Sequence, residues 1–300
     1  MKNYNIIQVK ESGTYLKGDT LLVKIKITDS ESFVVSDPSE VSITIIDPCG
    51  NELVDAAMDS EATGYYFYEY SFASDACCGI YDVNIETINK NQIAKFSYIV
   101  FPFDICSRVR EVLSAYQQND ISDYKLAIIA WHSYRTVLND VFELVYNENL
   151  YCNKIANDLY KVNNKPLADI NGDGVVTGTD VDSCQPDVSF YYINDDDEAT
   201  ELEVKVVDAR NGVVEIKDIP STADCLYITY YYESEYYDEE IMKEAVAYLT
   251  AYKVAMTYKS LDKATLADIQ TNRQLDPKIF KDKYEELIGM IGFSPIGCGK

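Results

Sequence analysis

The chain has 300 residues, of which 47% are hydrophobic and 25% are charged, the usual balance for proteins with apolar cores. Its 50 acidic residues against 26 basic ones give a net charge of −24. Such a surface repels phosphate, so tight binding to nucleic acid or to an anionic membrane is disfavoured. It suits cations, or a surface that DNA slides past without sticking; the alternative is a surface that serves solubility alone.

The cysteines and the single histidine limit the chemistry that can be expected. None of the eight cysteines forms a CxxC pair, and His132 is the only histidine, so no zinc site is expected. The scattered cysteines indicate free thiols in a reducing cell rather than a disulfide framework. The first residues lack the apolar stretch of a signal peptide, and no run approaches the length of a membrane helix. We therefore expect a protein made in the cytoplasm.

Residues 1–102 predict an all-β region. The stretch "TLLVKIKI" alternates, with Leu21, Val23, Ile25 and Ile27 on one face, and about seven such short strands, separated by turns, predict a β-sandwich. The stretches "GDTLLVKIKI", "ITIIDPCGN" and Gly79-Ile80-Tyr81 resemble an immunoglobulin-like domain, and the last is similar to the glycine-x-tyrosine of a tyrosine corner. The resemblance implies an adhesion, spacer or display module.

The hydrophobic period changes after residue 102. Residues 104–116 predict a short helix, and residues 122–148 predict a long one with Ser122 as its N-cap. The long helix has an apolar stripe: Leu126, Ala130, Tyr134, Val137, Leu138, Val141, Phe142 and Val145. We expect His132, Trp131 and Tyr134 to pack on a helix face, because no nucleophile motif accompanies the histidine.

The stretch "DINGDGVVTGTD", residues 169–180, has the ligand spacing of a calcium-binding loop. Oxygen ligands are required at positions 1, 3, 5, 7, 9 and 12, with glycine at position 6. The pattern predicts a calcium ion held by Asp169, Asn171, Asp173, the carbonyl of Val175, Thr177 and Asp180.

This calcium-like loop (residues 169–180) resembles a dockerin loop, which also ends in aspartate rather than glutamate. Dockerins carry two such loops, each followed by a helix, whereas here a single copy precedes a strand pattern. Binding to a cohesin is therefore not expected. We expect a structural calcium ion that ties the long helix to the following β-hairpin; the alternative is a turn rich in Asx and glycine that binds no ion.

Residues 187–233 predict a small sheet. Its hairpin turns at Arg210-Asn211-Gly212, since Asn-Gly is a strong hairpin signal. The acidic run Asp195–Glu198 either recruits a cation or forms a solvated turn. The stretch "YITYYYESEYY" is either a carbohydrate platform or a strand that leads into a helix, and 26 tyrosines in the chain indicate protein contacts.

Two further helices are predicted towards the C-terminus. Residues 238–261 carry an apolar stripe and a ridge of small residues, Ala247, Ala251 and Ala255, which allows close helix crossing within the fold or against a neighbouring subunit. Asp276 and Pro277 are a good N-cap and first residue for a helix over 277–290. Residues 291–300 read as a flexible tail or a strand that docks on a partner.

The predicted fold class is a multidomain α+β protein. An N-terminal immunoglobulin-like β-sandwich (1–102) precedes a helical connector domain (103–290) with a calcium-like loop and an inserted β-sheet (187–233), then a tail (291–300). The stretches "DISDYKLAIIAWHSYRTVLND", "GVVEIKDIP…LYITYYY" and "AVAYLTAYKVA" resemble the head–tail connector, or head-completion adaptor, proteins of tailed phages and tailed archaeal viruses. The calcium-like loop, its hairpin and the fused N-terminal domain are additions to the simplest members.

This resemblance implies a virion structural protein that is assembled in the host cytoplasm. It implies a homo-oligomeric ring, dodecameric in that family, between the portal protein and the tail or stopper proteins. DNA would pass through the ring without tight binding, and no membrane would be involved. The chain has no GxSxG, P-loop, HExxH or kinase motif, so neither catalytic residues nor an enzyme are expected. The alternatives are a calcium-stabilised extracellular adhesion or binding module and, with only tyrosines and acids in its favour, a glycan-active enzyme.

Overall fold

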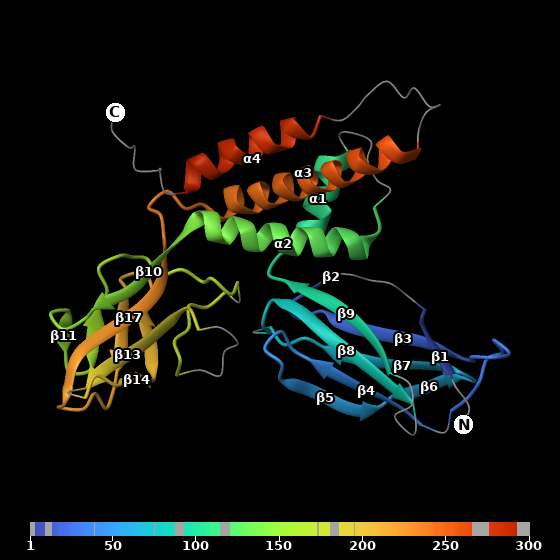
Figure 1. The fold of residues 1–300 in the computed structure, drawn as a ribbon, viewed down its shortest axis with the longest axis horizontal. Coiled ribbons are helices and arrows are strands. Elements are labelled where there is room, and N and C mark those ends of the chain that lie inside the picture. Colours follow the sequence, from blue (N-terminus) through green and yellow to red (C-terminus); the bar gives the residue numbers. More distant parts are fainter. Residues whose placement is uncertain are drawn as a thin grey trace. The chain divides into compact units, whose positions relative to one another are not determined.

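The computed structural model describes residues 4–9, 14–38, 40–74, 76–87, 93–114, 121–172, 174–180, 186–194, 196–265 and 276–292. The chain divides into two compact units, one of residues 1–106 and 118–131 and the other of residues 107–117 and 132–300. The described part contains four helices and four sheets, with more residues in strands than in helices (Figure 1). The prediction of a multidomain chain that contains both helices and sheets is therefore confirmed.

The first unit contains two β-sheets. One has the strand order β1 (Tyr4–Gln8), β3 (Thr20–Asp29), β7 (Tyr65–Ser71) and β6 (Asp59–Ala62). The other has the order β2 (Thr14–Leu16), β9 (Ile93–Phe101), β8 (Gly79–Thr87), β4 (Val41–Ile46) and β5 (Glu52–Ala57). All neighbouring strands are antiparallel except β2 and β9, which run parallel.

One apolar core lies between these two sheets. Alternate residues of β3, β4 and β8 are buried, because successive side chains of a strand point to opposite faces. The four predicted inward residues of β3 are completely buried: Leu21, Val23, Ile25 and Ile27. Tyr81 of β8 donates a hydrogen bond from its hydroxyl to the carbonyl of Cys77, just ahead of the strand, at 2.9 Å, which fixes the chain where it enters the strand.

The cysteines differ in part from the expectation of free thiols. Cys49, in the turn between β4 and β5, is disulfide-bonded, so the prediction is wrong at this position. Five others carry no disulfide bond: Cys77, Cys78, Cys106, Cys152 and Cys225. Spacing along the chain cannot reveal such a bond, because pairing depends on the separation of the residues in three dimensions.

Four helices are observed: α1 (Ile105–Ser114), α2 (Asp123–Val141), α3 (Glu239–Thr265) and α4 (Pro277–Ile291). α2 continues across the division between the units, and its predicted apolar stripe is buried from Leu126 to Val141. The helix predicted over 122–148 is wrong after residue 141, where β10 (Phe142–Asn149) begins. The stretch "FELVYNEN" pairs with a distant strand over residues 223–233, and this pairing overrides the helical pattern.

The later helices follow the predicted signals. Asp276 caps α4 by accepting a hydrogen bond from the Lys278 amide at 3.1 Å, and Pro277 occupies its first turn, as predicted. α3 and α4 lie side by side (Figure 1). The ridge of Ala247, Ala251 and Ala255 is buried, so of its two predicted uses the structure supports close packing within the fold.

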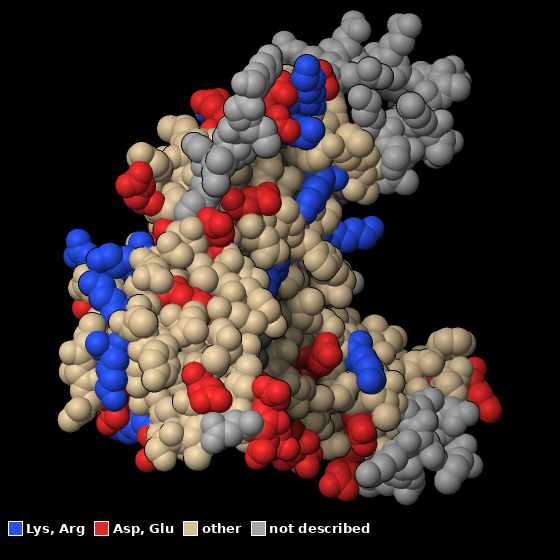
Figure 2. Space-filling view, turned by 60° about the vertical axis from the view of Figure 1, so that its left-hand side comes forward, with Lys and Arg blue, Asp and Glu red and all other residues tan. Residues whose placement is uncertain are grey.

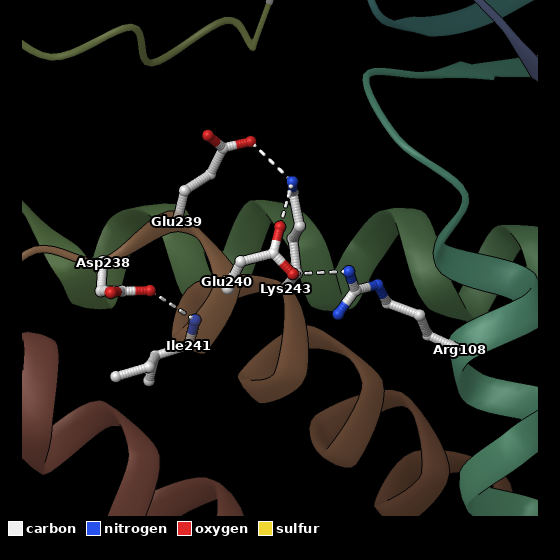
Figure 3. Close-up of polar contacts among 6 residues, drawn as sticks. All are labelled: Arg108, Asp238, Glu239, Glu240, Ile241 and Lys243. Carbon is white, nitrogen blue, oxygen red and sulfur yellow. Dashed lines mark hydrogen bonds and ion pairs between the residues drawn. The ribbon is translucent and has the colours of Figure 1, made fainter.

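The N-terminus of α3 carries a small charged network that also contacts α1 (Figure 3). The Asp238 carboxylate accepts the Ile241 amide at 3.0 Å, as an N-cap does. Lys243 Nζ lies 2.8 Å from both Glu239 and Glu240, and Arg108 of α1 lies 2.6 Å from Glu240. Acidic side chains suit this end of a helix, because its amides carry partial positive charge.

The second unit also contains two sheets that share one core. The first has the order β10, β17 (Ala223–Glu233), β13 (Val188–Asn194) and β14 (Ala199–Leu202). The second has the order β11 (Lys154–Ala156), β12 (Leu159–Lys161), β16 (Val213–Ile216) and β15 (Val204–Asp208). The predicted hairpin is confirmed, since β15 and β16 are antiparallel and Gly212 has φ +67°. β10, β11 and β12 were not predicted as strands.

Within the described ranges, no helix combines the length and the apolar character needed to span a membrane.

Candidate functional site

The calcium-like loop is anchored on the second unit from two sides. On the helical side, Arg135 of α2 donates from Nη1 to the Ile170 carbonyl at 2.8 Å. Gly172, with φ +77°, lies so close to α2 that a Cβ there would sit 2.3 Å from the Tyr134 hydroxyl. The segment around the loop therefore contacts the long helix by a charged hydrogen bond and by close packing.

On the other side, the loop lies against the hairpin of β15 and β16. The Asp180 amide donates to the Val204 carbonyl at 3.2 Å, and Thr179 Oγ1 accepts the Val204 amide at 3.0 Å. A Cβ on Gly178 would lie 1.9 Å from the Val204 carbonyl oxygen, so glycine is required at this approach. The loop thus connects the helix and the hairpin that the sequence analysis expected it to join.

Asp169, the first predicted ligand, organises the beginning of the loop. Its Oδ1 accepts the Gly172 amide and its Oδ2 accepts the Gly174 amide, both at 2.6 Å. Gly174 occupies the sixth position of the pattern with φ +82°, a conformation that favours glycine. The chain therefore turns sharply back over its first carboxylate, as a cation-binding loop does.

Asp187 is a structural residue of this site that the sequence analysis missed. It is 2% exposed, directly before β13. Its Oδ1 accepts the amides of Ile170 at 2.8 Å and Asn171 at 3.4 Å. Its Oδ2 accepts the Thr177 amide at 2.8 Å and the Thr177 hydroxyl at 3.3 Å. Such charge-assisted bonds are stronger than neutral ones, so Asp187 closes the loop from beyond its twelve residues.

The other predicted ligands have different environments. Asn171 is buried, Val175 is 59% exposed, Asp180 is exposed, and Asp173 lies outside the described residues. The loop's donors are all oxygens, the ligand type that calcium takes. Among the residues that the structure describes, no group of three or more His, Cys, Asp or Glu side chains is placed to hold a metal ion. A calcium ion here would therefore need Asn171, Thr177 and the Val175 carbonyl beside the carboxylates.

A carboxyl with an unusual proton affinity lies at the end of β17, near the loop. The Glu233 amide donates to the Pro166 carbonyl at 3.0 Å. Burial, together with the negative charges of Asp169 and Glu239, raises the pKa of Glu233 from 4.5 to about 7. Burial also raises the pKa of neighbouring Tyr237, so this phenol stays neutral at physiological pH. The site therefore takes up a proton near neutral pH.

The three aromatic residues of α2 named in the sequence analysis differ in how far they are buried. His132 is exposed rather than packed on a helix face, which corrects that expectation. Trp131 is half-buried with its ring centroid 5.8 Å from that of Phe101. Tyr134 is buried.

The tyrosine string and the acidic run fall in the small sheet of the second unit. The string forms β17 and then leads into α3, as one of the two interpretations predicts. Tyr230 is buried and hydrogen-bonds to the Glu148 carboxylate. In the acidic turn, the Asn194 side chain accepts the amides of Asp196 at 3.0 Å and Glu198 at 2.9 Å. Asp195 lies outside the described residues.

Comparison with known proteins identifies no family. The sequence matches no protein-family profile and no curated protein. Trypsin-activated alpha-2-macroglobulin from Escherichia coli is similar at a TM-score of 0.29 and 14% identity, over 76% of this chain and 14% of that one. β-Glucosidase from Listeria innocua in complex with glucose is similar at a TM-score of 0.24 and 13% identity, over 33% of this chain and 16% of that one. The chain thus spans only a small part of these proteins, and likenesses this weak carry no functional conclusion.

Proposed function

We propose that this chain is a virion structural protein, a head–tail connector or adaptor that forms a ring between the portal and the tail. The observation that supports this is the arrangement of the second unit, where a small β module is inserted between α2 and α3. Tyr284 of α4 hydrogen-bonds to Asp140 of α2, and Lys253 of α3 lies 3.4 Å from the Thr136 hydroxyl of α2. The three stretches on which the resemblance to connectors rests lie here, in α2, in β16 and β17, and in α3.

The charge of the chain suits this role. With a net charge of −24, the walls of a ring channel would repel phosphate and let DNA pass without being held. The partners would be further copies of the chain, the portal protein and the tail or stopper proteins. The protein would act in the virion, without a membrane and without a catalytic step.

We infer an immunoglobulin-like fold for the first unit. Two sheets that enclose one core support this inference, as does the Tyr81 hydroxyl bonded to the Cys77 carbonyl, which is the hydrogen bond of a tyrosine corner. On a connector, such a domain would serve as a spacer or as a display module.

We also propose that the calcium-like loop holds a structural calcium ion, with the predicted ligands Asp169, Asn171, Asp173, Val175, Thr177 and Asp180. Two observations support this: Gly174 has a positive φ, and its amide donates a hydrogen bond to the Asp169 carboxylate. A chelator should lower the melting temperature, and added calcium should restore it, because an ion that binds only the folded state stabilises it. Asp169→Asn should abolish the calcium response, whereas Asp224→Asn, at an exposed position, should keep it. A melting temperature that changes with neither chelator nor calcium would contradict the proposal of a bound calcium ion.

One observation favours the alternative of an extracellular adhesion or binding module. Cys49 is disulfide-bonded, and disulfides persist mainly in oxidising compartments. Ring formation distinguishes a connector from an adhesion module, since adhesion does not require a closed ring.

The test of the connector proposal is imaging of the purified protein by electron microscopy, alone and mixed with its portal partner. We expect rings of about twelve copies, the number implied by the connector resemblance, because closed rotational symmetry follows from one repeated contact between opposite surfaces. A monomer that binds glycans and no virion protein would contradict the proposal.

A further inference from the structure

The small β module of the second unit presents two outward sheet faces of different chemistry. Its two sheets share one core, so their inner side chains are buried and the residues between them point outward. On the sheet of β11, β12, β16 and β15 the outward side chains, with Lys217 directly after β16, form what we call the lysine face: Lys161, Lys205, Val207, Glu215 and Lys217. On the sheet of β10, β17, β13 and β14 they form the tyrosine face: Leu144, Tyr191, Glu201, Tyr227 and Tyr231.

The lysine face is a concentration of positive charge on a strongly acidic chain. Lys205 lies opposite Glu215 in the pairing of β15 with β16, and Lys217 Nζ lies 3.4 Å from Glu215 Oε1. The Lys217 side chain is 65% exposed, and Lys161 and Lys205 are exposed too. One glutamate among three lysines leaves the face positive. Figure 2 shows Lys and Arg side chains gathered along one edge of the view, apart from clusters of Asp and Glu.

The tyrosine face has the complementary character. Glu201, Tyr191 and Tyr227 lie in one cross-strand row, with the two tyrosine ring centroids 5.4 Å apart. Leu144 is 46% exposed and lies opposite Tyr231. The adjoining turn adds the exposed carboxylates of Asp196, Asp197 and Glu198. Tyr191, Tyr227 and Tyr231 are half-buried, so part of each side chain stays accessible. Tyrosines are enriched at protein interfaces, and carboxylates at the margin select a basic partner.

We propose that the lysine face of one copy docks on the tyrosine face and acidic turn of a second copy. This inference rests on the proposed ring and names the two surfaces that build it. Lysine ammonium groups would meet carboxylates and tyrosine rings. A lysine–tyrosine contact of this kind exists within the chain, where Lys154 Nζ lies 5.6 Å from the centroid of the Tyr160 ring. Because the two faces lie on opposite sides of one module, the contact is heterologous and repeats from copy to copy until a ring closes.

Charge reversal tests the contact by mass photometry at low and high salt. Lys161→Glu/Lys205→Glu/Lys217→Glu should weaken self-association at least tenfold, because like charges then face each other. Asp196→Lys/Glu198→Lys/Glu201→Lys should weaken it equally, and mixing the two variants should restore assembly. Lys278→Glu/Lys281→Glu/Lys283→Glu on α4 makes the same change in net charge elsewhere and should assemble normally. Circular dichroism of each variant checks that it is folded.

The outcomes separate this contact from the ring itself. Wild-type assembly that survives reversal of the lysine face overturns the contact and leaves the connector proposal standing. A wild type that stays monomeric at every salt concentration, with and without the portal partner, overturns both. A lysine-face variant that loses binding to a short DNA duplex but still assembles shows that the face serves nucleic acid, which also overturns the contact.

Discussion

The two β regions of this protein are both pairs of sheets around one core, but they are stabilised differently. In the first unit the core is an uninterrupted set of alternating apolar side chains from β3, β4 and β8. In the second unit, the chain between β12 and β13 carries the calcium-like loop, held by Asp187, Arg135 and Asp169 through hydrogen bonds. The first region therefore depends mainly on apolar burial, with hydrogen bonds such as that of Tyr81 at its margin, whereas the other also contains a buried carboxylate, Asp187, with both oxygens paired.

The largest effect is expected in the core of the first unit. Ile43 of β4 is completely buried, so Ile43→Ala should lower the free energy of unfolding of that unit by about 3–4 kcal/mol through lost transfer energy and a residual cavity. Chemical denaturation measures this loss. Leu53→Ala, on β5 and 42% exposed, is the control and should cost well under half as much. Equal losses for the two variants would show that the first unit does not depend on its apolar core.

Next in size is the loss of the buried carboxylate in the second unit. Asp187→Ala leaves the amides of Ile170 and Thr177 without their acceptor, which should cost roughly 2–3 kcal/mol. Urea denaturation, with the exposed Asp224→Ala as control, measures the effect. An Asp187→Ala protein as stable as its control would mean that the loop does not depend on this carboxylate.

The smallest expected effect is a dependence of stability on pH that comes from Glu233. Because the pKa of Glu233 rises from 4.5 in the unfolded chain to about 7 in the folded one, the folded protein binds more protons between these values. The tighter proton binding of Glu233 in the folded state therefore adds to the free energy of unfolding. This addition is fully present below pH 4.5 and is lost as the pH rises through 7. Glu233→Gln should remove this dependence in the presence of chelator and, allowing for partial solvent exposure, stabilise the protein at pH 8 by about 1 kcal/mol.

Urea midpoints at pH 5 and pH 8 check this sign. Glu239→Gln, whose carboxylate adds to the pKa shift of Glu233 and is itself exposed, should reduce the dependence without removing it. A wild type that gains stability from pH 5 to pH 8 relative to Glu233→Gln would contradict the assignment.

The sequence predicted those parts of the fold whose signals are local. The alternation of Leu21 to Ile27 marks β3, Asn211-Gly212 marks a hairpin, and Asp276-Pro277 marks the start of α4, because each pattern lies within one turn or one strand. β10 was not predicted, because Phe142 and Val145 continue the helical stripe of α2. Only the pairing with the distant β17 makes this segment a strand. β11 and β12 have three residues each, too few to show a period.

The residues of the candidate site were likewise predictable only where their roles depend on local spacing. Asp169 and Gly174 were recognised because their roles are set by spacing within a short loop. Asp187 follows the twelve-residue pattern, and its partners become apparent only when the chain has folded back on itself. Arg135 likewise looks like an ordinary residue of a helix until Ile170 is placed beside it.

In the second unit, the loop segment connects α2 to the small β module through Arg135. Hydrogen exchange at the amides of Ile170, Gly172 and Thr177 in wild type and Arg135→Met measures this connection, since the substitution removes the charged bond from α2. We predict exchange at least about tenfold faster at these amides, with Ile43 and Val83 of the first unit unchanged. Unchanged exchange in the loop, or equal acceleration in both units, would contradict the claim.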